Sequence, residues 1–323
     1  MLDKNFLNRP KIDLHCHLDG SMTLKSIQEI LGKEVTLSQV QASDDCGSLL
    51  EYLGKFDLPL ECVKTKEGLK KAAKDFLLDL QKDNIKYVEA RFAPGFSKHE
   101  DITYSEIMES VLEGLREASE ECGILYQVIA CCMRHMDDKT NMQMLKECRT
   151  YLGEGLSAID LAGDEVGFPA RNFYDLFEYA KKLDYPYTIH AGECGSAQNI
   201  LDAVEMGARR IGHGIAMMGD FETQKTLAKK RIGVEMCPIS NYQTKALQPG
   251  EIYPIREFAK NGVLVTLNTD NRLVSNTSIT REMEMLNGRF GIDPEEFYLY
   301  QMNAIDVAFC DDAVKHEVWK AIK

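Results

Sequence analysis

The sequence predicts an α/β fold, a (β/α)8 TIM-type barrel with extra C-terminal helices and a long insertion after the first strand. Helical and strand patterns alternate along the chain through eight strands. The connections late in the chain are short, and polar residues gather where the strands end. Parallel crossover units are the simplest topology for this order, and eight of them close into a barrel. A doubly wound open sheet is the alternative.

The first strand is predicted within residues 11–21, KIDLHCHLDGS. Alternate residues of a strand point to the same face, so His15 and His17 share one face with Asp13, and the apolar residues face the other way. Gly20 lets the chain turn after the strand. A single histidine is usually a hydrogen-bonded core or surface residue, but two at strand spacing predict a divalent metal site if other strands supply further ligands.

The other elements follow from hydrophobic spacing and from capping residues. Residues 41–60 lack clear periodicity but carry several Leu, Tyr and Phe residues, which is typical either of a partly helical flap over a site or of ordinary packing in a long insertion. Thr103 and Glu106 form a capping box, and Asp293 before Pro294 opens a later helix. Strands are predicted at 85–92 and from residues 125, 157, 187, 209, 233 and 263; helices are predicted at 23–31, 66–79, 139–151, 171–182, 197–206, 221–230, 254–260 and 280–287, and from residues 103, 293 and 311.

The length of 323 residues fits two average domains or one barrel. The absence of an internal repeat, a low-complexity tract or a linker favours one domain over residues 1–323. The net charge is −13, from 51 acidic and 38 basic residues, which opposes binding to nucleic acid and to anionic membranes. A neutral or cationic small molecule is the expected partner.

The cysteine pattern and the chain start predict a cytoplasmic protein. The ten cysteines form no CxxC pair and have no regular spacing, so they are expected to be reduced and buried. The first residues lack the apolar core of a signal peptide, and no stretch is long and apolar enough to span a bilayer.

Polar residues at the predicted strand ends would meet at one end of the barrel, where active sites of this fold lie. Three histidines and one aspartate make a site for zinc or a similar metal with one position open to solvent. Such a metal lowers the pKa of its water and generates hydroxide near neutral pH. The other histidines, His99, His135 and His316, have an ordinary surface explanation. The strand-end residues are His15, His17, Asp19, Asp164, Glu165, His190, Glu193, His213, Asp270 and Asn271.

Several familiar catalytic motifs are missing from the sequence. It has no HExxH, no Walker loop, no GxGxxG and no HxE with PCxxC. These absences argue against helical zinc proteases, nucleotide-triphosphate sites and cytidine-deaminase sites.

Six short motifs together resemble the adenosine deaminase family of metal-dependent amidohydrolase barrels. They follow the family order from the first strand to the last and cover the whole barrel. The motifs are HCHLDGS at 15–21, DLAGDE at 160–165, HAGE at 190–193, GHG at 212–214, CPISN at 237–241 and LNTD at 267–270.

The resemblance implies hydrolytic deamination of adenosine, and of 2′-deoxyadenosine, to inosine and ammonia in purine salvage. It implies that Glu193 handles the proton at purine N1, and that His213 orients the attacking hydroxide. Asp19 would bind the ribose 5′-hydroxyl and the Gly163 backbone would meet purine N3. The implied ligands of one catalytic zinc per chain are His15, His17, His190 and Asp270.

One position departs from the family pattern, because Asn271 stands where a second aspartate is common. An amide can donate to purine N7 without titrating, so Asn271 is expected to bind substrate; alternatively it only ends the strand in a turn. Adenine or modified-adenosine deamination, or a purine-binding barrel without turnover, remain the alternatives.

Overall fold

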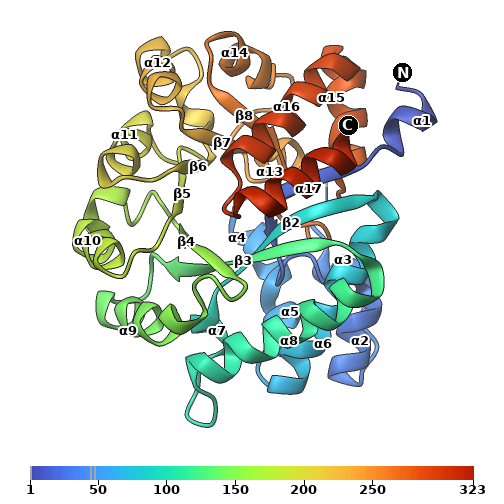
Figure 1. Ribbon diagram of the computed structural model, residues 1–323, viewed down its shortest axis with the longest axis vertical. Helices are drawn as coiled ribbons and strands as arrows, with labels where there is room; N and C mark the ends of the chain where they lie inside the picture. The colour runs from blue at the N-terminus through green and yellow to red at the C-terminus, as the bar shows by residue number, and fades with distance from the viewer. Residues whose placement is uncertain (1, 44–45, 47–48) are drawn as a thin grey trace.

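The computed structural model describes residues 2–43, 46 and 49–323, with the side chains of residues 49 and 50 left out. Eight parallel strands form its centre, and helices surround them (Figure 1). The strands are β1 (Lys11–His17), β2 (Ile85–Phe92), β3 (Leu125–Met133), β4 (Leu156–Ala162), β5 (Thr188–Ala191), β6 (Arg210–His213), β7 (Gly233–Met236) and β8 (Leu264–Leu267).

The strands form two four-stranded parallel sheets, in the orders β1-β2-β3-β4 and β5-β6-β7-β8. Parallel bridges join the sheets at both seams: Ile159 pairs with Tyr187, and Cys16 pairs with Asp270. The eight strands therefore form a closed ring. This confirms the predicted barrel over the open-sheet alternative.

Most helices begin and end where the sequence places them, because capping side chains satisfy the first free N–H groups. The predicted capping box of Thr103 with Glu106 forms. Asp293 caps its helix as predicted, and it also forms a capping box with Glu296. The helices are α1 (Lys4–Leu7), α2 (Leu24–Leu31), α3 (Leu37–Val40), α4 (Leu49–Leu53), α5 (Asp57–Cys62), α6 (Lys66–Asp79), α7 (Pro94–Ser97), α8 (Tyr104–Cys122), α9 (Asp138–Cys148), α10 (Tyr174–Lys182), α11 (Ala197–Met206), α12 (Phe221–Lys230), α13 (Pro238–Gln243), α14 (Ile255–Lys260), α15 (Ile279–Phe290), α16 (Pro294–Val307) and α17 (Asp312–Ile322).

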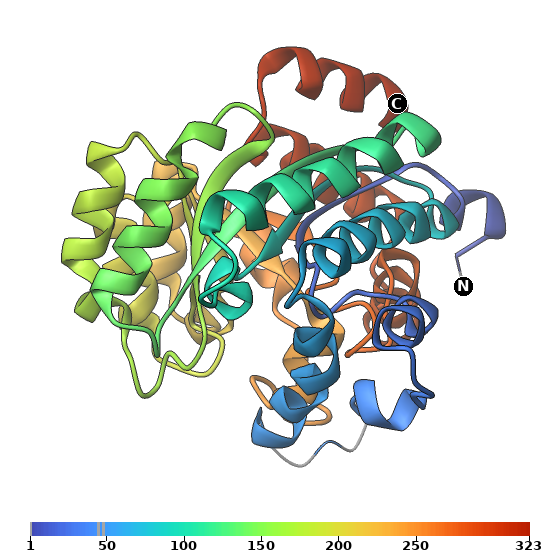
Figure 2. The same ribbon diagram turned by 90° about the horizontal axis from the view of Figure 1, so that it is seen from below.

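The insertion after β1 and the last helix lie at opposite ends of the barrel (Figure 2). Helices α16 and α17 bury Ile305 and Val318 against Ile12 and Leu14, near the start of β1. The insertion, with α3, α4 and α5, lies at the other end, where the strands finish. One end of the barrel is therefore sealed by apolar packing, and the other carries the insertion.

Several predicted elements differ in detail. The helix predicted at 171–182 begins as a 3-10 helix and becomes an α-helix at Tyr174, and the helix predicted at 280–287 extends to Phe290. The helix predicted at 139–151 begins at Asp138, because the side chain of Asp137 caps it, and it ends at Cys148 before a short 3-10 turn. β8 ends at Leu267, and Asp270 has a left-handed backbone with φ of 62°. The sequence predicts that Thr266, Asn268 and Asp270 share one face of the last strand. This alternation stops before Asp270, because the strand has ended. Within the described residues, no helix has the length and apolar character needed to cross a membrane.

Candidate active site

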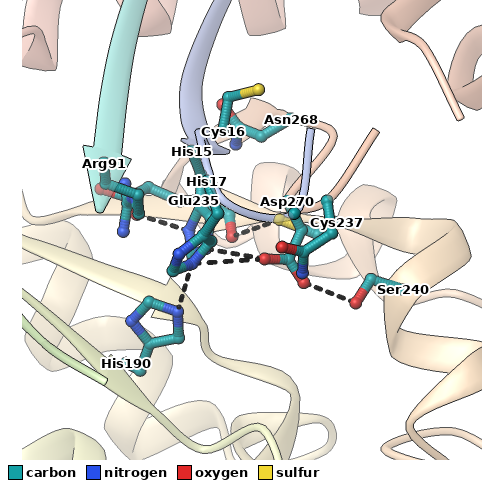
Figure 3. A network of polar contacts seen from close by, with 12 residues as sticks. His15, Cys16, His17, Arg91, His190, Glu235, Cys237, Ser240, Asn268 and Asp270 are labelled. Atoms are coloured by element: carbon teal, nitrogen blue, oxygen red, sulfur yellow. Dashed lines mark hydrogen bonds and ion pairs between the residues drawn. The ribbon is translucent and has the colours of Figure 1, made fainter. Parts of the chain in front are cut away.

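Histidines from three strands and the aspartate that follows β8 converge at the carboxyl end of the barrel. Figure 3 shows His15, His17 and His190 of this group together with Asp270. His15 Nε2 and His17 Nε2 each lie 3.4 Å from Asp270 Oδ1. The Nε2 atoms of His17 and His190 lie 3.3 Å apart. His213, at the end of β6, adds a fourth ring at 4.9 Å from His15, measured between ring centroids.

This cluster has the donor set of a site for a divalent metal. The nearest ligand atoms of His15, His190, His213 and Asp270 all lie within 4.8 Å of one another, and all four side chains are buried. His15 Nε2 is buried and has no hydrogen-bond partner among the described residues. A buried ring nitrogen without a partner costs free energy, and a metal ion would satisfy it. The residues therefore fit a metal of the zinc type.

Two of the histidines are held by buried carboxylates behind them. His15 Nδ1 lies 2.8 Å from Glu235, and His190 Nδ1 lies 2.8 Å from Asp160. Arg91 joins the two carboxylates, with 2.8 Å ion pairs to each. A carboxylate at Nδ1 places the proton there and leaves the Nε2 lone pair for a metal. Neither carboxylate is among the residues predicted from the sequence; the signal was an acid within each of two apolar strands.

Glu193 lies just beyond β5 and faces the same cavity. Its Oε2 atom is 3.7 Å from His213 Nε2, and Thr244 donates a 3.0 Å hydrogen bond to its Oε1 atom. Burial raises the pKa of Glu193 to about 8, and the charges of Asp270 and Glu165 add to the shift. The carboxyl group therefore holds a proton at neutral pH. Burial also lowers the pKa of His213 well below its usual value, which keeps that ring neutral.

The turn that carries Glu193 is fixed from below by Glu165. The carboxylate of Glu165 accepts hydrogen bonds from the backbone N–H groups of Gly192, Cys194 and Gly195. Three N–H groups converging on one acid make a rigid turn. Glu165 thus positions the Glu193 backbone, a role that its place at the end of β4 did not reveal from sequence.

A short segment after β7 holds three of the site residues. Ser240 donates a 2.5 Å hydrogen bond to Asp270 Oδ2, and Asn241 Nδ2 lies 3.0 Å from His213 Nδ1. Thr244, which follows α13, completes the set through its bond to Glu193. Pro238 at the start of α13 fixes where this helix begins.

These residues border a cavity of about 350 Å³. Asp19, Gly163 and Asn271 all line it, as the sequence predicts for residues that bind substrate. Burial raises the pKa of Asp19 to about 7. His135, which sequence reasoning assigned to the surface, is exposed but also lines this cavity.

The insertion forms one wall of the cavity, which supports the flap interpretation over ordinary packing. Tyr52, Leu53, Phe56 and Leu60 line the space, whereas the side chains of residues 49 and 50 lie outside the described part. The Tyr52 hydroxyl accepts a 3.0 Å hydrogen bond from Asn271 Nδ2 and lies 2.7 Å from Ser275 Oγ. The insertion is thereby tied to the loop after β8.

Comparisons with known proteins agree with this geometry. The family model described as adenosine deaminase matches residues 10–323. The adenosine deaminase of Clostridium botulinum (strain Okra / Type B1) is 41% identical over 99% of this chain and 98% of its own. An amidohydrolase of Burkholderia ambifaria with bound Zn has a TM-score of 0.87 at 21% identity, with 98% of this chain and 90% of that chain covered. The Arabidopsis N6-mAMP deaminase has a TM-score of 0.86 at 26% identity, with 99% of both chains covered.

Proposed function

This chain belongs to the adenosine deaminase family, and on that premise we propose that it hydrolyses adenosine, and 2′-deoxyadenosine, to inosine and ammonia. The observation that carries the proposal is the placement of Glu193. Its protonated carboxyl group lies beside His213 and lines the same cavity as Asp270. Attack at purine C6 disrupts the aromatic ring, and a proton delivered to N1 makes that step easier.

The proposed metal is one zinc ion per chain, held by His15, His17, His190 and Asp270. When bound, zinc supplies hydroxide near neutral pH. Glu235 and Asp160 support this assignment, because they leave the Nε2 atoms of His15 and His190 free to bind the ion. Ser240 supports it as well, since its hydrogen bond orients the Asp270 carboxylate.

His213 is proposed as a neutral donor that orients the attacking oxygen and stabilises charge as the bond to C6 forms. Preorganised donors aimed at developing charge are commonly the largest single contribution to catalysis. The low pKa of His213 supports a neutral ring, and the 3.7 Å distance between His213 Nε2 and Glu193 Oε2 supports the proposal that both groups act on one reacting position.

The proposed substrate is a nucleoside rather than a nucleotide. No Lys or Arg is among the described residues that line the cavity, whereas Asp19, Asp164 and Glu165 are. A 5′-phosphate needs cationic or N–H donors and is repelled by carboxylates. Asp19 is proposed to bind the ribose 5′-hydroxyl, the Gly163 backbone to meet N3, and Asn271 to donate to N7. A cytoplasmic location stays a prediction from the cysteine pattern.

The test is ammonia release from adenosine by the purified, zinc-loaded protein. Adenine, AMP and N6-methyl-AMP are measured in parallel, and the Glu193→Gln variant is the control for contaminating activity. The proposal expects the highest kcat/KM for adenosine or 2′-deoxyadenosine and none above background for the variant. A higher kcat/KM for adenine or for a nucleotide would identify that compound as the substrate instead of adenosine. If no compound released ammonia, the protein would be a purine-binding barrel without turnover.

A further inference from the structure

His213 has a different kind of partner from the other histidines of the cluster. Its Nδ1 atom lies 3.0 Å from the side-chain nitrogen of Asn241, not from a carboxylate. The Asn241 side-chain oxygen in turn accepts a 2.8 Å hydrogen bond from the Tyr253 hydroxyl. The three side chains are almost completely buried. They form a linear chain of hydrogen bonds that is shielded from solvent.

This chain determines where the His213 proton sits. In the structure the Tyr253 hydroxyl donates to the oxygen of the Asn241 amide, and the amide N–H group points toward His213 Nδ1. An N–H donor facing Nδ1 requires a lone pair on that nitrogen. A neutral imidazole carries one proton, which must then be on Nε2, the nitrogen that faces Glu193.

The opposite arrangement holds for His15 and His190. His15 Nδ1 hydrogen-bonds to Glu235, and His190 Nδ1 lies 2.8 Å from Asp160. A carboxylate beside Nδ1 favours the proton on that nitrogen, so the Nε2 atoms keep a lone pair. The partner of Nδ1 therefore distinguishes the three rings. An amide faces His213, the proposed proton donor, whereas a carboxylate faces His15 and His190, the proposed metal ligands. Distance alone does not separate them, because the ligand atoms of all three histidines lie within 4.8 Å of one another and of Asp270.

We propose that Asn241, oriented by Tyr253, is a positioning residue that holds His213 as an Nε2–H donor and keeps it out of the metal coordination. The inference rests on the proposed deaminase function for its catalytic consequence. The proton position itself does not depend on that function. Asn241 is not among the described residues that line the cavity, and its side chain contacts His213 and Tyr253, so it acts through His213.

The direct test is 15N NMR of histidine side chains in the zinc-loaded native protein without substrate, with His213→Gln used to assign the resonances. The expected result is a neutral His213 ring protonated at Nε2. A ring protonated at Nδ1 would overturn the proposal, because the Asn241 amide would then have to present its oxygen. This measurement is independent of turnover, so it stands even if adenosine is not the substrate.

The matching kinetic test is Asn241→Asp, which replaces the donor with an acceptor in the same volume. The proton should move to Nδ1, and kcat for adenosine should fall about 10²-fold or more, the usual scale for a lost donor at developing charge. KM should change by less than about threefold, because a group that acts only in the transition state leaves substrate binding intact. A kcat within about twofold of native, in a folded and zinc-loaded variant, would contradict the proposal.

Tyr253→Phe is the second variant, and it keeps the proposal testable if Asn241→Asp does not fold. Loss of the hydroxyl leaves the amide free to rotate, so both ring tautomers should appear by NMR and kcat should fall. Tyr185→Phe is the matched control, because Tyr185 is similarly buried and is not among the described residues that line the cavity. Its hydroxyl donates a 2.9 Å hydrogen bond to the Leu145 carbonyl. An equal change in kcat for the two Tyr→Phe variants would make the effect structural and overturn the proposal.

Discussion

The Nε2 atoms of His17 and His190 lie 3.3 Å apart across the end of the barrel. Burial lowers the pKa of His17 well below its usual value, so its ring is neutral. Asp160 behind His190 directs that ring's Nε2 lone pair toward the same point. Two ring nitrogens and the Asp270 carboxylate thus surround one position suited to a metal.

The proposed ligand set predicts different zinc contents for alanine variants of His17 and His213. His17→Ala, like His15→Ala or Asp270→Ala, should lose stoichiometric zinc and deamination together, because each removes a proposed ligand. His213→Ala should keep zinc and lose turnover. Metal analysis after gel filtration gives the readout. If His17→Ala retained zinc and His213→Ala lost it, His213 would be the metal ligand and His17 would not.

Glu193→Gln should keep the metal and the fold but lower turnover by at least about 10²-fold, because the amide cannot deliver a proton to N1. Glu282→Gln is the comparison, since Glu282 is a buried acid outside the cavity lining. Steady-state kinetics on adenosine, with zinc content measured on the same sample, decide the point. Near-native turnover would leave Glu193 as a structural acid at the start of a turn.

Asp19→Ala should reduce the preference for adenosine over adenine. A site built around a substrate hydroxyl leaves a polar group unpaired when that hydroxyl is missing, which lowers kcat/KM for adenine in the native protein. The variant removes this difference. The ratio of kcat/KM for the two substrates is the measurement, and an equal loss on both would remove Asp19 from ribose binding.

Asn271→Ala should cost about 1–3 kcal/mol in kcat/KM on adenosine and much less on 7-deazaadenosine. Asn271 Nδ2 already donates one proton to Tyr52, so its second proton is the one proposed to reach N7. Tyr52→Phe serves as the control, because it removes the neighbouring contact but keeps the amide. If the 7-deaza penalty is the same in native protein and variant, Asn271 and N7 do not interact.

Glu282→Gln should raise stability increasingly as the pH rises from about 5 to 8. Burial raises the pKa of Glu282 to about 8, above the usual 4.5. Its protonated form fits the folded protein at low pH. As the pH rises from the unfolded-state pKa to the folded-state pKa, the native protein should lose up to about 1.4 kcal/mol for each pH unit. Glutamine has no charge to bury, so the variant escapes this loss.

Thermal unfolding at pH 5, 6.5 and 8 measures the effect of the Glu282 substitution. The exposed Glu284→Gln on the same helix is the control, because its carboxylate stays in water in both states. A stability difference between native protein and Glu282→Gln that does not vary with pH would contradict the prediction.

The fold was predictable because hydrophobic spacing and capping residues act locally. Thr103 and Asp293 cap the helices that their sequences indicate, and parallel strands joined by helices have few topologies available. In a barrel the carboxyl ends of the strands meet at one end, so His15, His190 and Asp270 could be predicted to lie together without any knowledge of side-chain geometry. For Asp270 the predicted location is correct, but the alternation of faces does not account for it, because the strand ends three residues earlier.

The side chains that orient the site histidines could not be predicted from the sequence, because they contact histidines that lie on other strands. Glu235 is an acid within an apolar strand, but only the closed barrel places it beside His15. Asn241 lies within a matched motif, yet its contact depends on how α13 packs after β7. His135 lies in a loop, and its place on the cavity wall depends on the tertiary arrangement of that loop.

The seam between β8 and β1 joins residues that lie far apart in the chain. Asp270 donates its backbone N–H to the His15 carbonyl, and its own carbonyl accepts from the N–H of His17, both at 2.7 Å. During synthesis His15 and His17 emerge first and Asp270 among the last, so a nascent chain that ends before β8 has the histidines but no closing bridge. The closing bridge and the fourth proposed metal ligand therefore come from the same residue, Asp270.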